Sequence, residues 1–121
     1  MKILVYGAGV LGCNLARNLL RAGKDVTLLA RGNWAAEIRR NGLRIKDKFS
    51  LRTSVSRIPV VTELAPDAMY DVIFVVLYAD HYKKVEGKME KHPVIDYQSG
   101  TGRRYGRSAA LQQDRIRRLA L

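Results

Sequence analysis

Residues 2–12 read KILVYGAGVLG, a short apolar run that passes directly into a glycine-rich loop. Apolar residues then recur every three or four positions up to Gly23, which predicts an amphipathic helix with a glycine at its C-terminal end. A second apolar run, residues 26–29, follows and ends close to Arg31. The order of strand, glycine turn, helix and strand is typical of the first unit of a dinucleotide-binding parallel sheet. The buried face of the helix is expected to carry Leu11, Leu15 and Leu19.

The loop residues have separate roles in this motif. Gly7 permits a tight exit from the strand, Gly9 lets a pyrophosphate approach the backbone, and Gly12 lets the helix lie close to the sheet. The anion then rests on the free N–H groups at the start of the helix, around Val10 and Leu11. Because a strand precedes the glycines and a helix follows them, we favour a cofactor loop over an ordinary flexible turn.

The end of the second strand indicates which dinucleotide is bound. An acidic residue at this place would bind the ribose 2′-hydroxyl of NAD, whereas an arginine can hold the 2′-phosphate of NADP through two hydrogen bonds. The chain has Arg31 here and no acid at the end of the strand. The alternative is an ordinary solvated arginine in a strand-to-helix loop. We favour NADP as the cofactor, with Arg31 as the ligand of its 2′-phosphate.

The composition bounds the class of protein. With 121 residues, 47% of them hydrophobic and 27% charged, the chain suits one folded α/β domain or the first domain of a longer protein. No apolar run approaches the length of a membrane span and no signal peptide is recognisable, so we expect a cytoplasmic protein that does not contact membranes. Cys13 at the helix start is read as a reactive thiolate or, in preference, as a small packing residue. We expect no metal site.

The net charge of +11 suggests nucleic-acid binding as a further interpretation. More than half of this charge lies in residues 83–121, which hold ten Lys and Arg against four Asp and Glu. These basic residues lack interleaved aromatic side chains apart from Tyr97 and Tyr105, and no recognition-helix motif stands out. We therefore favour a solvated basic tail, without a nucleic-acid partner.

Further elements of the same sheet are predicted downstream. A short helix capped by Asn33 is expected to end at Asn41 and Gly42. Alternation from residue 43 to residue 55, with a turn at residues 46–48, predicts two half-exposed strands, and residues 58–61 predict an edge strand. The run VIFVVL, residues 72–77, is the most apolar in the chain and predicts a central parallel strand that is buried on both faces.

Several side chains are expected near the ligand-binding edge of this sheet. Leu77 and Tyr78 follow the central strand and are predicted to contact the cofactor, since the carboxyl ends of parallel strands share one edge with the glycine loop. Trp34 is read as covering an adenine face or, in preference, as packing against the edge of the sheet. His81 is read as a general acid or, in preference, as a solvent-facing residue of a loop.

The character of the chain changes after residue 82. We predict a Rossmann-type domain over residues 1–82 and a basic tail of uncertain structure over residues 83–121. Within the tail, residues 83–92 suggest a polar helix, residues 93–97 a weak strand, and residues 108–121 a short helix. Because the sheet then lacks its later strands, its bare edge predicts association into a homo-oligomer.

Four segments together resemble the ketopantoate reductase (2-dehydropantoate 2-reductase) family, over about residues 1–80. They are KILVYGAGVLG at residues 2–12, DVTLLARG at 25–32, IRRNGL at 38–43 and YDVIFV at 70–75. The resemblance implies an NADPH-dependent reduction of a 2-keto acid, 2-dehydropantoate to pantoate, in pantothenate biosynthesis. It gives Gly7, Gly9 and Gly12 the phosphate-loop role and Arg31 the 2′-phosphate role.

The chain also departs from the family pattern. Tyr78 stands where family members usually have a lysine, and residues 98–100, Gln-Ser-Gly, only faintly match a later glutamine-asparagine-glycine motif. The helical second domain, which in the family brings the catalytic lysine, has no counterpart here. We therefore name no catalytic residue and expect an oxidoreductase domain that is incomplete at its C-terminal end. The alternative is a non-catalytic nucleotide-binding or redox-sensing module.

Overall fold

The segments around the glycine loop form the centre of a parallel sheet. The computed structural model describes residues 1–46, 52–97 and 104–105. Its strands are β1 (Lys2–Tyr6), β2 (Asp25–Leu29), β3 (Leu43–Lys46), β4 (Thr53–Ser56), β5 (Val60–Val61), β6 (Val72–Val75), β7 (Val94–Asp96) and β8 (Arg104–Tyr105). Its helices are α1 (Val10–Arg21), α2 (Gly32–Asn41), α3 (Ala79–Val85) and a 3₁₀ turn, η1 (Glu86–Met89).

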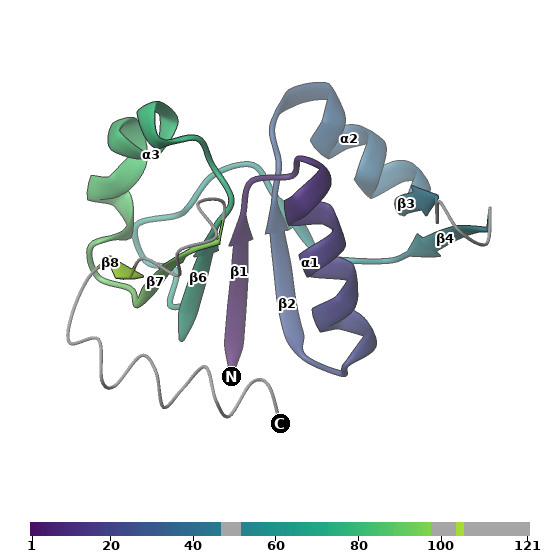
Figure 1. The fold of residues 1–121 in the computed structure, drawn as a ribbon, viewed down its shortest axis with the longest axis horizontal. Coiled ribbons are helices and arrows are strands. Elements are labelled where there is room, and N and C mark those ends of the chain that lie inside the picture. Colours follow the sequence, from purple (N-terminus) through teal and green to yellow (C-terminus); the bar gives the residue numbers. More distant parts are fainter. Residues whose placement is uncertain (47–51, 98–103, 106–121) are drawn as a thin grey trace.

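The main sheet has the strand order β5-β2-β1-β6-β7-β8, and Figure 1 labels all of these strands except the two-residue β5. Its first five strands run parallel, and β8 pairs antiparallel with β7. In the register of the central strands, Val5 of β1 lies between Leu28 of β2 and Phe74 of β6. The chain moves outward on one side of β1 and then returns to its other side, which is the strand order of a Rossmann fold. The predicted α/β fold class is therefore confirmed.

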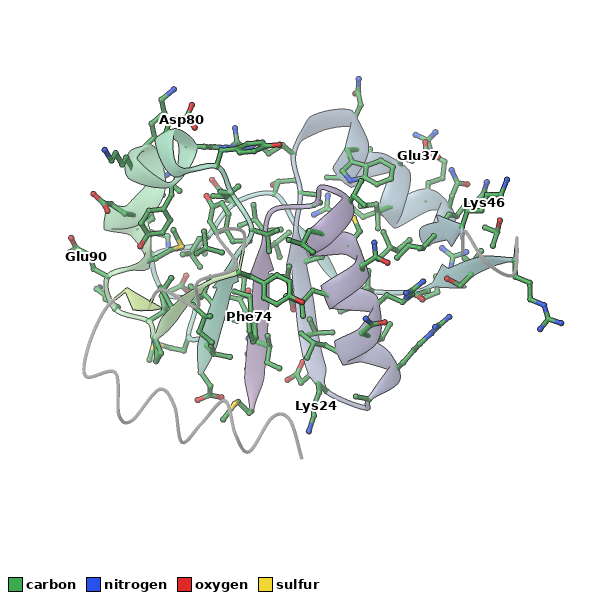
Figure 2. The ribbon with its side chains drawn as sticks, in the orientation of Figure 1. Lys24, Glu37, Lys46, Phe74, Asp80 and Glu90 are labelled. Carbon is green, nitrogen blue, oxygen red and sulfur yellow. The ribbon has the colours of Figure 1, made fainter. Side chains whose placement is uncertain are left out.

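Alternate residues of each central strand are buried on opposite faces of the sheet. Alternate residues of β1 and β6 that include Ile3, Val5 and Phe74 pack toward α1 and α2, whereas Leu4 and Ile73 pack toward α3 and η1. Figure 2 shows charged side chains such as Lys24, Glu37, Asp80 and Glu90 at the outside of the molecule, and Phe74 against the sheet. Strands that are apolar on both faces are what a sheet covered by helices on both sides requires.

Several downstream predictions are confirmed. The run at residues 72–77 contains the buried β6 between β1 and β7, and the segment with Pro59 leads into the outer parallel strand β5. The alternating residues form the antiparallel β3–β4 hairpin. Gly23 follows α1 with a φ of 77°, which suits its place just after a helix. Residue 46 of the predicted turn is the last residue of β3, and residues 47–48 lie outside the described residues. The Gln-Ser-Gly segment and the helix over residues 108–121 lie outside them too.

Other expectations about helices were wrong. Leu11 is 41% exposed, contrary to expectation, whereas Leu15 and Leu19 pack partly buried against the core, as expected. The most buried residues of α1 are the small ones, Gly12, Cys13 and Ala16, because the helix lies close to the sheet. The N-cap of α2 is Arg31 and not Asn33, because the helix already begins at Gly32. The helix expected over residues 83–92 begins earlier, at Ala79.

The sheet does not stop at residue 82. β7 pairs with β6 in parallel, with Phe74 opposite Ile95, and the backbone N–H of Tyr97 donates to the carbonyl oxygen of Val75 at 2.9 Å. The weak strand predicted at residues 93–97 is thus part of the main sheet. The division into a domain of residues 1–82 and a basic tail stays a prediction, as does self-association. None of the helices among the described residues is long and apolar enough to span a membrane.

Candidate functional site

The glycine loop leaves β1 at the centre of the sheet, where the order of the strands reverses. In open parallel sheets, ligands bind outside the carboxyl ends of the strands at such a point. The loop that follows β6, with Leu77 and Tyr78, lies at the same end of the sheet (Figure 1). Leu77 lies close to the glycine loop, because a Cβ added to Gly7 would be only 3.2 Å from its Cδ2 atom. The loop after β6 and the glycine loop are therefore close together, as predicted.

Two of the three loop glycines fill places that no side chain could occupy. Gly7 has a φ of 121°, and a Cβ there would lie 2.5 Å from the carbonyl oxygen of Val76. A Cβ at Gly12 would overlap the carbonyl oxygen of Gly7, so the helix can approach the sheet only without it. These contacts agree with the roles predicted for the two glycines, the turn after the strand and the close packing of the helix.

Gly9 differs from them because open space surrounds it. A Cβ at Gly9 would have no neighbour within 4 Å. Gly9 is the N-cap of α1, no side chain caps the helix, and the first intrahelical bond runs from the N–H of Cys13 to the carbonyl oxygen of Gly9 at 2.9 Å. The N–H groups of Val10, Leu11 and Gly12 precede that bond and have no acceptor within the helix. This start of α1 is suited to an anion.

Arg31 lies at the junction of β2 and α2, as predicted, and its side chain is exposed. Its Nη2 atom lies 3.1 Å from Nδ1 of His81. The Arg31 charge also acts on Tyr6: burial raises the pKa of Tyr6, and Arg31 opposes that rise. Arg31 therefore faces the carboxyl end of the neighbouring strand β1, and sequence reasoning had not connected it to His81.

His81 does not occupy the solvent-facing loop position that we favoured. It lies in the first turns of α3 and is half-buried. The pKa of His81 is lowered, mainly by burial and further by the charges of Arg31 and Lys84. The charge of Asp80 acts in the opposite direction. Tyr78, the N-cap of α3, is 75% exposed, so its ring is accessible from solvent.

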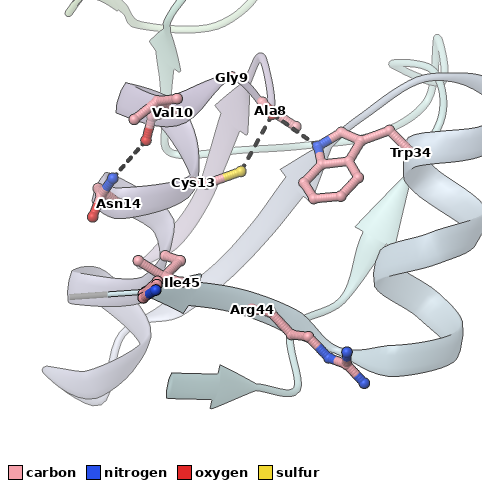
Figure 3. Close-up of a pocket in the computed structure, with 9 residues that line it drawn as sticks. Ala8, Gly9, Val10, Cys13, Asn14, Trp34, Arg44 and Ile45 are labelled. Carbon is pink, nitrogen blue, oxygen red and sulfur yellow. Dashed lines mark hydrogen bonds between the residues drawn. The ribbon is translucent and has the colours of Figure 1, made fainter. Parts of the chain in front are cut away.

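A cavity of about 660 Å³ lies beside the glycine loop, between α1, α2 and β3 (Figure 3). Its lining includes Gly9, Cys13, Trp34, Arg44 and Ile45. The indole N–H of Trp34 donates to the carbonyl oxygen of Ala8 at 2.8 Å, so this side chain packs against the glycine loop rather than the edge of the sheet. The sequence pattern carries no signal for that contact.

Cys13 lies under the same loop. The residue is 6% exposed, and its thiol donates to the carbonyl oxygen of Ala8 at 3.3 Å. Burial raises the pKa of the Cys13 thiol, against a smaller opposing effect of Trp34. The thiol therefore stays protonated near neutral pH, which favours the packing role over a reactive thiolate. Among the described residues, no group of three or more His, Cys, Asp and Glu side chains is placed to hold a metal ion.

Comparison with known proteins identifies the family. A sequence model described as ketopantoate reductase PanE/ApbA matches residues 3–92. The chain belongs to the ketopantoate reductase family. The family resemblance inferred from the four sequence segments is thus confirmed, and the residues that match it include the whole of the site around the glycine loop.

Relatives and solved structures agree with this assignment. A 2-dehydropantoate 2-reductase of Pyrococcus abyssi is 32% identical over 108 residues, which are 84% of this chain and 34% of the relative. A structure from Enterococcus faecalis, provisionally named as a 2-dehydropantoate 2-reductase, superposes with a TM-score of 0.63 at 27% identity and covers 78% of this chain and 32% of its own. The chain thus spans about a third of the length of these ketopantoate reductases.

One more distant structure carries a bound dinucleotide. D-mandelate dehydrogenase, solved with NADH and anilino(oxo)acetate, superposes with a TM-score of 0.62 at 21% identity and covers 75% of this chain and 29% of its own. At this identity the likeness shows the fold alone. The bound cofactor of that enzyme is NADH, so it does not bear out NADP for the present chain.

Proposed function

We propose that this chain is the NADP(H)-binding domain of an oxidoreductase of the ketopantoate reductase family. The single observation that carries the proposal is the uncapped start of α1 next to the open space at Gly9. A diphosphate fits this place because free N–H groups and the positive end of a helix dipole both favour an anion. Gly7 and Gly12, which admit no side chain, hold the backbone of the loop in that arrangement.

The choice of NADP over NAD rests on Arg31. A guanidinium forms charge-assisted hydrogen bonds with a phosphate, and it would leave the ribose 2′-hydroxyl of NAD without the carboxylate that usually binds it. Arg31 stands at the end of β2 with an exposed side chain, so it is available to a ligand. Leu77 and Tyr78, after β6, are the proposed contacts on the other side of β1.

The proposed reaction of the whole protein is the reduction of a small 2-keto acid, 2-dehydropantoate, to its 2-hydroxy acid, pantoate. The cofactor supplies the hydride, and the protein binds and orients it. Support comes from the family and from relatives that are named 2-dehydropantoate 2-reductases. We assign no proton donor within the described residues, so the groups that act on the substrate are proposed to lie outside them.

Titration of the 121-residue chain with NADPH and with NADH, followed by nicotinamide fluorescence, tests this proposal. We expect saturable binding with a clear preference for NADPH. Arg31→Asp is expected to weaken NADPH by about 10- to 100-fold, because a hydrogen bond to a charged group contributes about 1.5–3 kcal/mol. NADH should change by less than about threefold, since it carries no 2′-phosphate to meet Arg31.

Two control variants sharpen the result. Arg40→Asp makes the same charge change at an exposed position of α2 and should leave both affinities almost unchanged. Gly9→Val should abolish binding of both dinucleotides, because a branched side chain would occupy the place of the diphosphate. Equal losses of NADPH and NADH in Arg31→Asp would refute the role of Arg31 in cofactor choice.

A further inference from the structure

Two side chains from opposite sides of β1 meet at the carboxyl end of the sheet. Arg31 follows β2 and His81 lies in α3, which follows β6, and β2 and β6 flank β1. The Nη2 atom of Arg31 lies 3.1 Å from Nδ1 of His81, although fifty residues separate them in the sequence. The pair therefore bridges the two halves of the sheet at the edge where the glycine loop leaves β1.

The chemistry of this contact fixes the protonation state of the histidine. A guanidinium only donates hydrogen bonds, so Nδ1 of His81 must accept, and the proton of the neutral ring is on Nε2. A doubly protonated ring has no acceptor and would repel Arg31. The surroundings act in the same direction, because burial, Arg31 and Lys84 lower the pKa of His81 and only Asp80, of the same helix, raises it.

A phosphate bound by Arg31 would reverse this balance. The phosphate oxygens are stronger acceptors for the guanidinium than an imidazole nitrogen, so the anion replaces His81 as the partner of Arg31. The displaced imidazole then lies beside an anion of charge about −1.5 to −2. An opposite charge within about 4–6 Å favours the protonated ring, which can donate a hydrogen bond to the phosphate from Nδ1.

We propose that His81 is a second side chain that recognises the 2′-phosphate of NADP(H), and that it takes up one proton from the solvent when the phosphate binds to Arg31. The inference rests on the proposed NADP(H) binding and deepens it. Arg31 supplies a permanent charge at this place, whereas His81 adds its charge only when the phosphate is present. His81 is in this account a specificity residue for the cofactor and not a general acid for the substrate.

The proposal fixes the direction of a pH effect. The complex with NADPH holds one more proton than the free chain. Affinity for NADPH should therefore rise as the pH falls from the raised pKa of His81 in the complex to its lowered pKa in the free chain. Protonation of the 2′-phosphate itself, with a second pKa near 6, opposes this rise at lower pH. The effect of His81 should therefore be measured above about pH 6.5, where the phosphate is mostly doubly ionised. NADH, which has no 2′-phosphate, should show no such dependence.

Calorimetry of the 121-residue chain at pH 7, repeated in several non-phosphate buffers of different ionisation enthalpy, counts the protons taken up. For the unaltered chain we expect a larger proton uptake with NADPH than with NADH, by a sizeable fraction of one proton, because the phosphate favours the protonated ring of His81. This count needs no variant. No difference between the two dinucleotides in the proton count would overturn the inference.

A His81→Gln variant tests the residue itself. Glutamine can still accept from Arg31 but cannot be protonated, so the proton uptake should disappear. Affinity for NADPH should fall by about three- to tenfold at pH 6.5 and by less than twofold at pH 8.5, with NADH unchanged at both. Lys88→Gln removes a charge of the same sign from the exposed turn η1 and should keep the proton uptake.

The outcomes separate this inference from the proposed function. If His81→Gln matches the unaltered chain while NADPH still binds more tightly than NADH and still depends on Arg31, only the role of His81 is refuted. If the unaltered chain does not distinguish NADPH from NADH, the proposed choice of cofactor fails, and the role of His81 fails with it.

Discussion

Replacing Gly12 by alanine sets two opposite effects against each other. In a helix, alanine is more favourable than glycine by about 1 kcal/mol, so helix propensity alone predicts a more stable protein. The Cβ of the new residue would overlap the carbonyl oxygen of Gly7 and lie 3.5 Å from Cβ of Val76. The distance to Val76 is ordinary van der Waals contact, but the oxygen of Gly7 belongs to the backbone, so the backbone of α1 or of the loop must shift.

The steric effect should exceed the gain in propensity. Overpacking of this kind costs about 1–3 kcal/mol, and collision with a backbone oxygen favours the upper end of that range. Subtracting the gain in propensity leaves a net loss of about 2 kcal/mol in the free energy of unfolding. In urea, with an m-value of about 2 kcal/mol/M, the midpoint should therefore fall by about 1 M.

Gly9→Ala is the matched control in the same loop. Because a Cβ at Gly9 meets nothing within 4 Å, this variant should keep its free energy of unfolding within about 0.5 kcal/mol. It should weaken both dinucleotides, since its methyl group stands at the open place proposed for the diphosphate. A Gly12→Ala chain as stable as the unaltered one would refute the close approach of α1 to the sheet.

Two further predictions concern the core. Ile73 is fully buried in β6, so Ile73→Ala should reduce the free energy of unfolding by about 2–5 kcal/mol in urea denaturation. Val55→Ala, at a position that is 56% exposed, should reduce it by less than about 1 kcal/mol. Equal losses in the two variants would contradict the burial of β6. Burial raises the pKa of the Cys13 thiol, so iodoacetamide at pH 7.5 should alkylate the folded chain at least about tenfold more slowly than the urea-unfolded chain. Equal alkylation rates would show an accessible thiol.

The central part of the fold could be predicted because its signals are local. Three patterns each predict one element from neighbouring residues alone: the strand before Gly7, the glycine spacing and the apolar run of β6. Their order along the chain implies a parallel sheet. The places of Arg31 and of Tyr78 follow directly, since each lies just after a strand whose carboxyl end is at the ligand edge.

What could not be predicted depends on contacts between distant residues. Leu11 fits a helical repeat and is nevertheless 41% exposed, because the repeat does not encode which residues of the first turn of α1 meet the sheet. The bond from Trp34 to the backbone of Ala8 and the contact of Arg31 with His81 join segments that only the folded sheet brings together. The same holds for β8, whose pairing with β7 no local pattern announces.

The most direct test of the account is a crystal structure of the chain with NADP⁺. The account predicts the diphosphate on the backbone N–H groups of Val10, Leu11 and Gly12, and the 2′-phosphate against the guanidinium of Arg31. A crevice filled by the protein's own side chains, or a 2′-phosphate that points away from Arg31 into solvent, would contradict it.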